Sequence, residues 1–271
     1  MEDQAKLTGV PETMLLTLYH RALETRRPDR LFADELAVSF VERIDHDFAK
    51  FDDWRMEWTI PVRTWLIDTA VREFLERSPG AAVVTLGAGL CTRALRLDNG
   101  RAQWFSVDLE SVRPFWQSLI GASARNRFVT GPVTDFSWID QVVGAVRNGP
   151  FLVVAEGLFQ YLPEASVKEI VLTIRDRLPG AELVLDAFGD FTINNTRLNH
   201  TVAATGSVFR WGLNDCKDIE TWASGIELLD QWYLMDHQPE RQGYMARLPG
   251  MFGGKGQFGK VARVRLGARR T

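Results

Sequence analysis

Two glycines and a later carboxylate have the types and spacing of a nucleotide-binding turn. Gly87 and Gly89 directly follow a predicted strand at residues 82–86, and Asp108, 19 residues after Gly89, ends a second one at 103–107. Glycine lets the chain turn sharply and lets a ligand approach the backbone closely. An acid at the end of the second strand can accept hydrogen bonds from both hydroxyls of a ribose. These residues therefore predict a site for a ligand that contains a nucleoside.

The third glycine position of the turn separates two classes of such ligands. A dinucleotide fingerprint reads G-x-G-x-x-G and brings a helix N-terminus to a pyrophosphate, but Thr92 occupies the third position here. S-adenosylmethionine has a ribose and an adenine but no pyrophosphate. We therefore expect residues 87–89, with Ala88 between the glycines, to bind S-adenosylmethionine. An NAD(P) site and a turn without a ligand are the alternatives.

A second carboxylate follows a fully apolar run. Glu156 comes directly after residues 151–155, so its side chain is expected to be partly desolvated. Such a group needs a partner, which is the ammonium of a ligand, an arginine or a proton. A purely structural ion pair is the alternative. Tyr161, five residues later, is either a site residue or part of the core.

Asp135 and Phe136 follow the third predicted strand, at residues 127–130. The carboxylate of Asp135 can accept a hydrogen bond from the exocyclic amine of adenine, and a neighbouring aromatic ring can lie against the base. An aspartate that only initiates a turn is an equally good interpretation.

The chain after residue 80 alternates between strand and helix patterns, which predicts an α/β fold with a doubly wound, mostly parallel sheet. The clearest helix begins at Pro163 and ends before Pro179. Residues 1–79 are expected to form an N-terminal helical cap on a core of residues 80–271, with a substrate-pocket insertion around 189–225 in one structural unit. The predicted strands are 82–86, 103–107, 127–130, 151–155, 181–188 and, as a terminal antiparallel pair, 227–234 and 257–266.

The composition excludes several classes of partner. A formal net charge of -3 without a basic cluster gives no reason to expect nucleic acid. No apolar run approaches the length of a membrane span, and no signal peptide is recognisable, so we expect a cytoplasmic protein without a membrane partner. Cys91 and Cys216 match no metal-ligand spacing, and no metal is expected. The sequence does not indicate the oligomeric state.

Several motifs, in order, resemble the leucine carboxyl methyltransferase-like family, and within it the bacterial branch of tetracenomycin-type polyketide carboxyl O-methyltransferases. The resemblance covers residues 19–163, which is over half of the chain. The matching residues are 19–24, 27–34, Arg63, 84–93, 96–97, 107–109, 134–135, Trp138, 156–157 and 161–163.

The resemblance implies a fold, a cofactor and roles for individual residues. The fold would be the Rossmann-like class I methyltransferase sheet, with seven strands of which the last is antiparallel. The cofactor would be S-adenosylmethionine, which leaves as S-adenosylhomocysteine. Cys91 stands where the family has Asp, so Thr92 or water is expected to cap the next helix. The resemblance implies that Arg63 binds the methionine carboxylate, Asp108 the ribose and Asp135 the adenine amine, with Glu156 beside the methionine portion. The other cofactor-binding residues are expected to be Arg21, Gly87, Ala88, Gly89, Leu109 and Phe136.

The acceptor is expected to be a small molecule that carries a carboxylate. A carboxylate, with a pKa of about 4, is already ionised near neutral pH and needs no general base, whereas a phenol, at about 10, needs one. The candidate catalytic residues are Glu156, Tyr161 and His20, and Arg197 and Arg210 are candidate partners of the acceptor's charge. A phenol O-methyltransferase with His20, Glu156 or His200 as its base is the second hypothesis. A non-catalytic cofactor-binding relative is the third.

Overall fold

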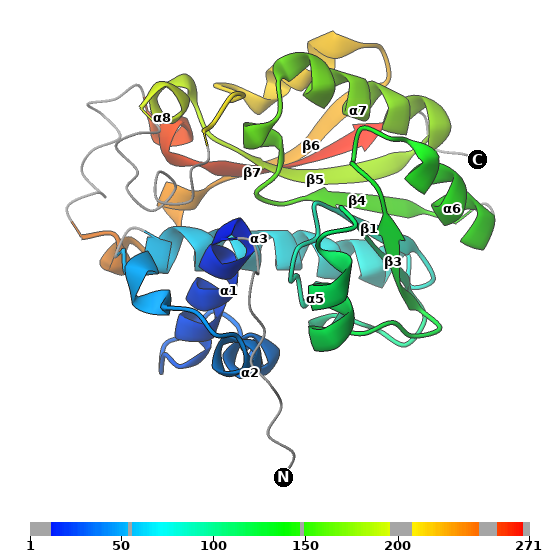
Figure 1. The fold of residues 1–271 in the computed structure, drawn as a ribbon. Helices are drawn as coiled ribbons and strands as arrows, with labels where there is room; N and C mark the ends of the chain where they lie inside the picture. Colours follow the sequence, from blue (N-terminus) through cyan, green and yellow to red (C-terminus); the bar gives the residue numbers. More distant parts are fainter. Residues whose placement is uncertain (1–11, 54–55, 147–148, 196–207, 244–253, 268–271) are drawn as a thin grey trace.

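The computed structural model describes residues 12–53, 56–146, 149–195, 208–243 and 254–267. Their centre is a seven-stranded sheet in the order β3-β2-β1-β4-β5-β7-β6 (Figure 1). β7 is antiparallel to both of its neighbours, and the other pairs are parallel. The predicted class of fold is thus confirmed. The strands are β1 (Ala82–Leu86), β2 (Gln103–Asp108), β3 (Asn126–Thr130), β4 (Phe151–Ala155), β5 (Ala181–Ala187), β6 (Ile226–Tyr233) and β7 (Lys260–Leu266).

The largest difference from the predicted strands is at the start of β7. Residues expected to open this strand instead form the short 3-10 helix η9 (Lys255–Phe258). Gly259 follows with a φ of 123°, a left-handed conformation that interrupts the extended chain. β7 therefore begins only at Lys260. Of the Gly-rich connection before it, residues 244–253 lie outside the described part of the chain.

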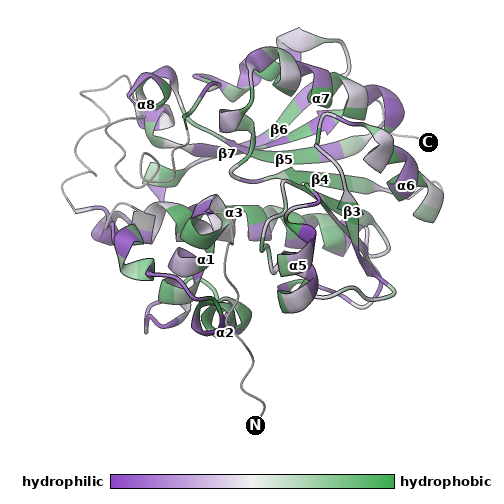
Figure 2. Ribbon diagram, in the orientation of Figure 1, coloured by the Kyte–Doolittle hydropathy of each residue, from purple (hydrophilic) through white to green (hydrophobic). Residues whose placement is uncertain are grey.

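Helices cover both faces of the sheet, and the alternation of side chains along each strand supplies both cores. On one face, Val84 and Val153 pack with α6 (Ser137–Ala145) and α7 (Glu164–Arg177). On the other face, Val83 and Val154 pack with α3 (Met56–Arg77). Figure 2 shows the hydrophobic central strands between helices whose outer surfaces are hydrophilic. Shorter elements are α4 (Arg93–Arg96), α5 (Arg113–Leu119), η2 (Phe159–Tyr161), α8 (Asp190–Asn194), η4 (Cys216–Trp222), η5 (Leu234–Asp236) and η6 (Pro239–Arg241).

The N-terminal helices have a hydrophobic cluster of their own. It joins α1 (Glu12–Thr25), α2 (Glu35–Arg43) and η1 (Phe48–Phe51), and it includes Leu90 of the glycine turn. The cap therefore packs directly on the loop that follows β1. Because α3 also covers a face of the sheet, we propose that the cap and the core form one structural unit.

Candidate functional site

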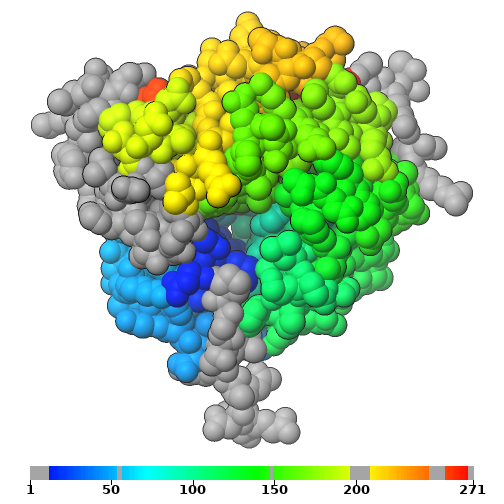
Figure 3. All heavy atoms as spheres, turned by 45° about the horizontal axis from the view of Figure 1, so that its top comes forward, coloured from blue at the N-terminus to red at the C-terminus, as the bar shows by residue number. Residues whose placement is uncertain are grey.

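A cavity of about 680 Å³ lies at the carboxyl ends of β1, β2 and β4. Figure 3 shows the hollow between the N-terminal helix and the segment that starts at residue 208. Ligands of open α/β sheets bind at this edge, where the strand order reverses between β1 and β4. The sequence-predicted residues that line the cavity are Arg21, Arg63, Gly87, Ala88, Gly89, Asp108, Leu109, Glu156, Tyr161 and Arg210.

The glycine turn and the end of β2 are connected through one carboxylate. Asp108 accepts a hydrogen bond from Gly89 N on Oδ2 (2.7 Å) and one from Leu109 N on Oδ1 (2.7 Å). Burial raises the pKa of Asp108, and the two backbone bonds oppose this shift. Gly87 and Gly89 have φ values of 58° and 48°, which favour glycine. A Cβ at Gly89 would also lie only 3.1 Å from Met14 Cγ, so the turn is packed tightly under the cap.

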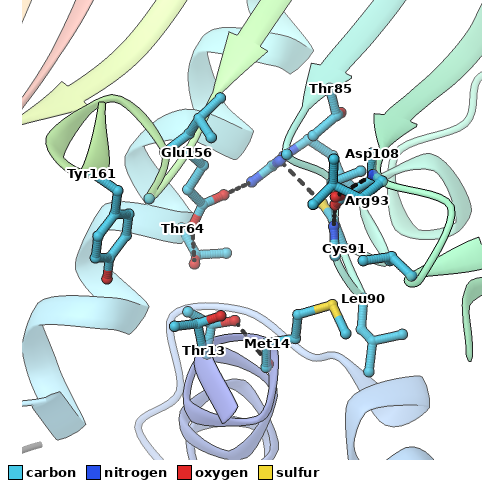
Figure 4. Close-up of a pocket in the computed structure, with 18 of the residues that line it drawn as sticks. Thr13, Met14, Thr64, Thr85, Leu90, Cys91, Arg93, Asp108, Glu156 and Tyr161 are labelled. Atoms are coloured by element: carbon cyan, nitrogen blue, oxygen red, sulfur yellow. Dashed lines mark hydrogen bonds and ion pairs between the residues drawn. The ribbon is translucent and has the colours of Figure 1, made fainter. Parts of the chain in front are cut away.

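Glu156 binds two arginines. Its Oε2 lies 2.6 Å from Arg93 Nη2, and its Oε1 lies 3.2 Å from Arg63 Nε and accepts a hydrogen bond from Thr64 Oγ1 (3.0 Å). Burial alone would raise the pKa of Glu156, but Arg93 and Arg63 outweigh it and lower the pKa to about 2. Of the partners that the sequence left open, the structure thus supplies arginine. Figure 4 shows Glu156, Thr64 and Arg93 together at the cavity.

Further buried charges extend this pair into a network. Arg93 Nε contacts Asp68 Oδ1 (2.7 Å), and Arg96 binds the same carboxylate. Arg63 Nη1 contacts Oδ2 of Asp186 (3.3 Å). The other oxygen of this carboxylate, Oδ1, accepts a hydrogen bond from Gly157 N (2.6 Å). Sequence reasoning missed this network. The available signal was Asp186, which with Glu182 is one of two carboxylates in the otherwise apolar strand β5.

Arg21 joins the cap to the glycine turn. Its Nη2 donates to Leu90 O (2.8 Å), and its Nη1 donates to Asp34 Oδ2 (2.7 Å) and Thr92 Oγ1 (2.8 Å). The Thr92 hydroxyl donates to Asp34 Oδ2 (2.6 Å), and its oxygen accepts from Arg21 and from Arg96 Nε (3.1 Å). It makes no cap bond to α4. Of the two predicted caps, Thr92 or water, the first was wrong, and the second stays a prediction. Cys91 Sγ instead accepts a hydrogen bond from Arg93 Nη1 (3.2 Å).

His20 is not among the residues that line the cavity. In α1, Thr13, Thr17 and Arg21 repeat every fourth residue and face the cavity. His20 lies one position away from this face, is fully buried, and contacts Tyr19 with the ring centroids 5.6 Å apart. Burial lowers its pKa to about 4. The helical period therefore directs His20 into the cap and away from the predicted catalytic position.

Asp135 and Phe136 also lie outside the lining of the cavity. Asp135 is exposed, and its Oδ1 accepts a hydrogen bond from Ser137 N (3.1 Å) at the start of α6. The two residues lie on the next loop along the same sheet edge, since Gly131 N donates to Asp108 O (2.9 Å). Their role at an adenine remains a prediction. Arg197 and His200 lie outside the described residues.

A sheet of this order, with a glycine turn and an acidic β2 end at one cavity, is the arrangement that the family resemblance implies for an S-adenosylmethionine-dependent methyltransferase. The profile of leucine carboxyl methyltransferase matches residues 14–175. The chain belongs to this family.

Two relatives support this assignment over most of the chain. The tetracenomycin polyketide synthesis O-methyltransferase TcmP of Streptomyces glaucescens is 33% identical over 238 residues, which are 87% of each chain. The S-adenosyl-L-methionine-dependent methyltransferase dpfgK of Gibberella zeae is 28% identical and covers 92% of this chain and 90% of its own. The protein is thus an S-adenosylmethionine-dependent methyltransferase.

Solved structures show the same fold at low sequence identity. A DUF574 family protein from Streptomyces avermitilis covers 94% of this chain and 97% of its own, with a TM-score of 0.61 and 14% identity. A methyltransferase from Anabaena variabilis covers 83% of this chain and 96% of its own, with a TM-score of 0.53 and 14% identity. Within the described ranges, no helix is long and apolar enough to cross a membrane.

Proposed function

We propose that the protein is an O-methyltransferase that methylates a carboxylate of a small molecule. The proposal rests on how the candidate bases at the cavity are bonded and placed. Glu156 is bound between two arginines, Asp108 accepts two backbone N–H groups, and His20 is absent from the lining. None of these three groups is available as a general base. An acceptor that is already ionised fits this cavity, because it needs none.

The residues of the cavity fit S-adenosylmethionine. The backbone of Gly87, Ala88 and Gly89 would lie against the cofactor, and Asp108 with Leu109 would bind the ribose hydroxyls. Nη2 of Arg63 has no bonding partner within the described ranges, so it can donate to the methionine carboxylate while Nε and Nη1 remain paired. Glu156, which pairs with Nε of Arg63, would lie near the methionine ammonium. Arg21 contributes by holding Leu90 O.

The chemistry requires little more than placement. When bound, S-adenosylmethionine supplies a methyl group on a sulfonium, and an acceptor oxygen forms its bond to that carbon as the bond to sulfur breaks. The chain's own residues orient the acceptor and exclude water, which is the main source of catalysis for a direct displacement. Burial raises the pKa of Tyr161, so its hydroxyl stays protonated and can donate a hydrogen bond to an acceptor oxygen. No proton has to leave a carboxylate acceptor.

The acceptor class is tested with a panel of carboxylic acids, each paired with the phenol or alcohol of the same skeleton. Because TcmP is named for polyketide synthesis, polyketide-type acids come first. We expect acids to yield methyl esters that alkali hydrolyses, detected by mass spectrometry together with S-adenosylhomocysteine. Alkali-stable methyl ethers from the phenols, with no ester from any acid, would replace the proposal by the phenol hypothesis.

The cofactor site is tested with Asp108→Ala. Removal of this carboxylate should weaken S-adenosylmethionine binding at least tenfold, measured by calorimetric titration, because it removes the ribose acceptor and releases Gly89 N. Glu110→Ala is the matched control, since this exposed acid lies two residues later and does not line the cavity. Unchanged affinity in Asp108→Ala would contradict the assignment.

A further inference from the structure

The arginines of the cavity fall into two kinds. Four of them, Arg21, Arg63, Arg93 and Arg96, have side chains at most 9% exposed and are each paired with a carboxylate. Arg210 is exposed and, among the residues that the structure describes, has no carboxylate partner. Its charge is therefore available to a ligand.

The backbone of Arg210 is held firmly beside η2. Arg210 N donates to Gln160 O (2.7 Å), next to Tyr161 in the sequence. The preceding Phe209 is buried and stacks on Phe188, with the centroids 5.4 Å apart and the planes at 15°. Phe209 also meets the ring of Tyr161 edge-on at 5.4 Å. A guanidinium on a fixed backbone loses less conformational freedom when it binds a ligand.

The residues near Arg210 indicate which kind of ligand this part of the cavity could bind. Tyr161 lines the same cavity and offers a hydroxyl, and Figure 4 shows its side chain at the cavity edge. Val208, two residues before Arg210, also lines the cavity and is 63% exposed, so its apolar side chain is available for contact with a ligand. A cation, a hydroxyl and an exposed apolar side chain together match an anionic group attached to an apolar body.

We propose that Arg210 binds the carboxylate of the methyl acceptor and that Val208 packs against the apolar body beside it. This inference rests on the proposed function. A guanidinium forms charge-assisted hydrogen bonds to a carboxylate, which select it over a neutral isostere. Methylation removes the negative charge, so the ester loses this attraction and leaves more readily than the acid. Arg210 thus determines specificity for acids and favours product release.

The experiment uses the acid that the parent protein methylates best, with its methyl ester and carboxamide as ligands. In Arg210→Gln, the KM for the acid should rise at least tenfold, while the affinity for S-adenosylmethionine stays within twofold. Arg210→Lys should restore part of the loss because it restores the charge. The parent should bind the acid more tightly than its ester or amide, and Arg210→Gln should bind all three about equally.

The matched control is Lys217→Gln, which removes an exposed cation that does not line the cavity, and its KM should not change. An unchanged KM for the acid in Arg210→Gln would overturn this inference alone. If the parent methylates no acid in the panel, the proposed function fails, and the role of Arg210 fails with it. The two failures are therefore distinguishable by the activity of the parent.

Discussion

The two sides of the cavity differ in whether their arginines are paired with carboxylates. On the proposed cofactor side, Arg63 and Arg93 are buried against Glu156, and further carboxylates complete their pairing. On the proposed acceptor side, Arg210 is exposed and no described carboxylate binds it. The fold therefore pairs the charges on the first side with one another, whereas the second side keeps a charge that is unpaired among the described residues and that a ligand can bind.

The largest expected effect is the loss of stability in Arg93→Met. The Arg93 side chain is 1% exposed and binds both Asp68 and Glu156. Its removal leaves two buried carboxylates with one cation fewer, which typically costs about 3–5 kcal/mol. The free energy of unfolding, from denaturant titration, should fall by this amount.

The control for Arg93→Met is a pair at the surface. Arg26 lies 3.5 Å from Glu42, and both side chains are at least half exposed. Exposed pairs contribute less than about 1 kcal/mol, so Arg26→Met should leave the stability nearly unchanged. Equal losses in the two variants would show that the buried network is not a distinct part of the molecule.

The sequence revealed the cofactor side only where adjacent residues carry the signal. The glycine turn, Asp108 and Glu156 each follow an apolar strand, so their common sheet edge was predictable. The partners of Glu156 were not, because Arg93 and Arg63 reach it from α4 and α3, which are distant from it in the sequence. Similarly, His20 differs from Arg21 by one position on α1, and only the packing of that helix decides which one faces the cavity.

A smaller effect tests the interior of the cap, which contains a titratable group that belongs to neither side of the cavity. Burial lowers the pKa of His20 to about 4, so the folded protein keeps it neutral while the unfolded chain protonates it below about 6.5. The free energy of unfolding that neutral, buried His20 contributes is fully present above pH 6.5 and is lost as the pH falls toward 4. Between pH 8 and pH 5, the parent should lose about 2 kcal/mol more stability than His20→Gln.

Activity provides the second measurement for His20. Since His20 does not line the cavity, the pH profile of kcat in His20→Gln should match that of the parent at temperatures where both are folded. A fall in kcat at low pH that is present in the parent and disappears in His20→Gln would instead return His20 to the catalytic residues.

The smallest expected effect is that of Cys91→Asp. This variant tests whether an arginine on the proposed cofactor side can pair with one more carboxylate. Cys91 lines the cavity, and its sulfur accepts a hydrogen bond from Arg93 Nη1. A carboxylate there would form a charge-assisted bond to the same nitrogen, which is stronger than a bond to sulfur. Affinity for S-adenosylmethionine should therefore stay within twofold of the parent, and the melting temperature should not fall. A tenfold loss of affinity, absent from Cys91→Ala, would mean that the arginines of this side tolerate no further negative charge beside the cofactor.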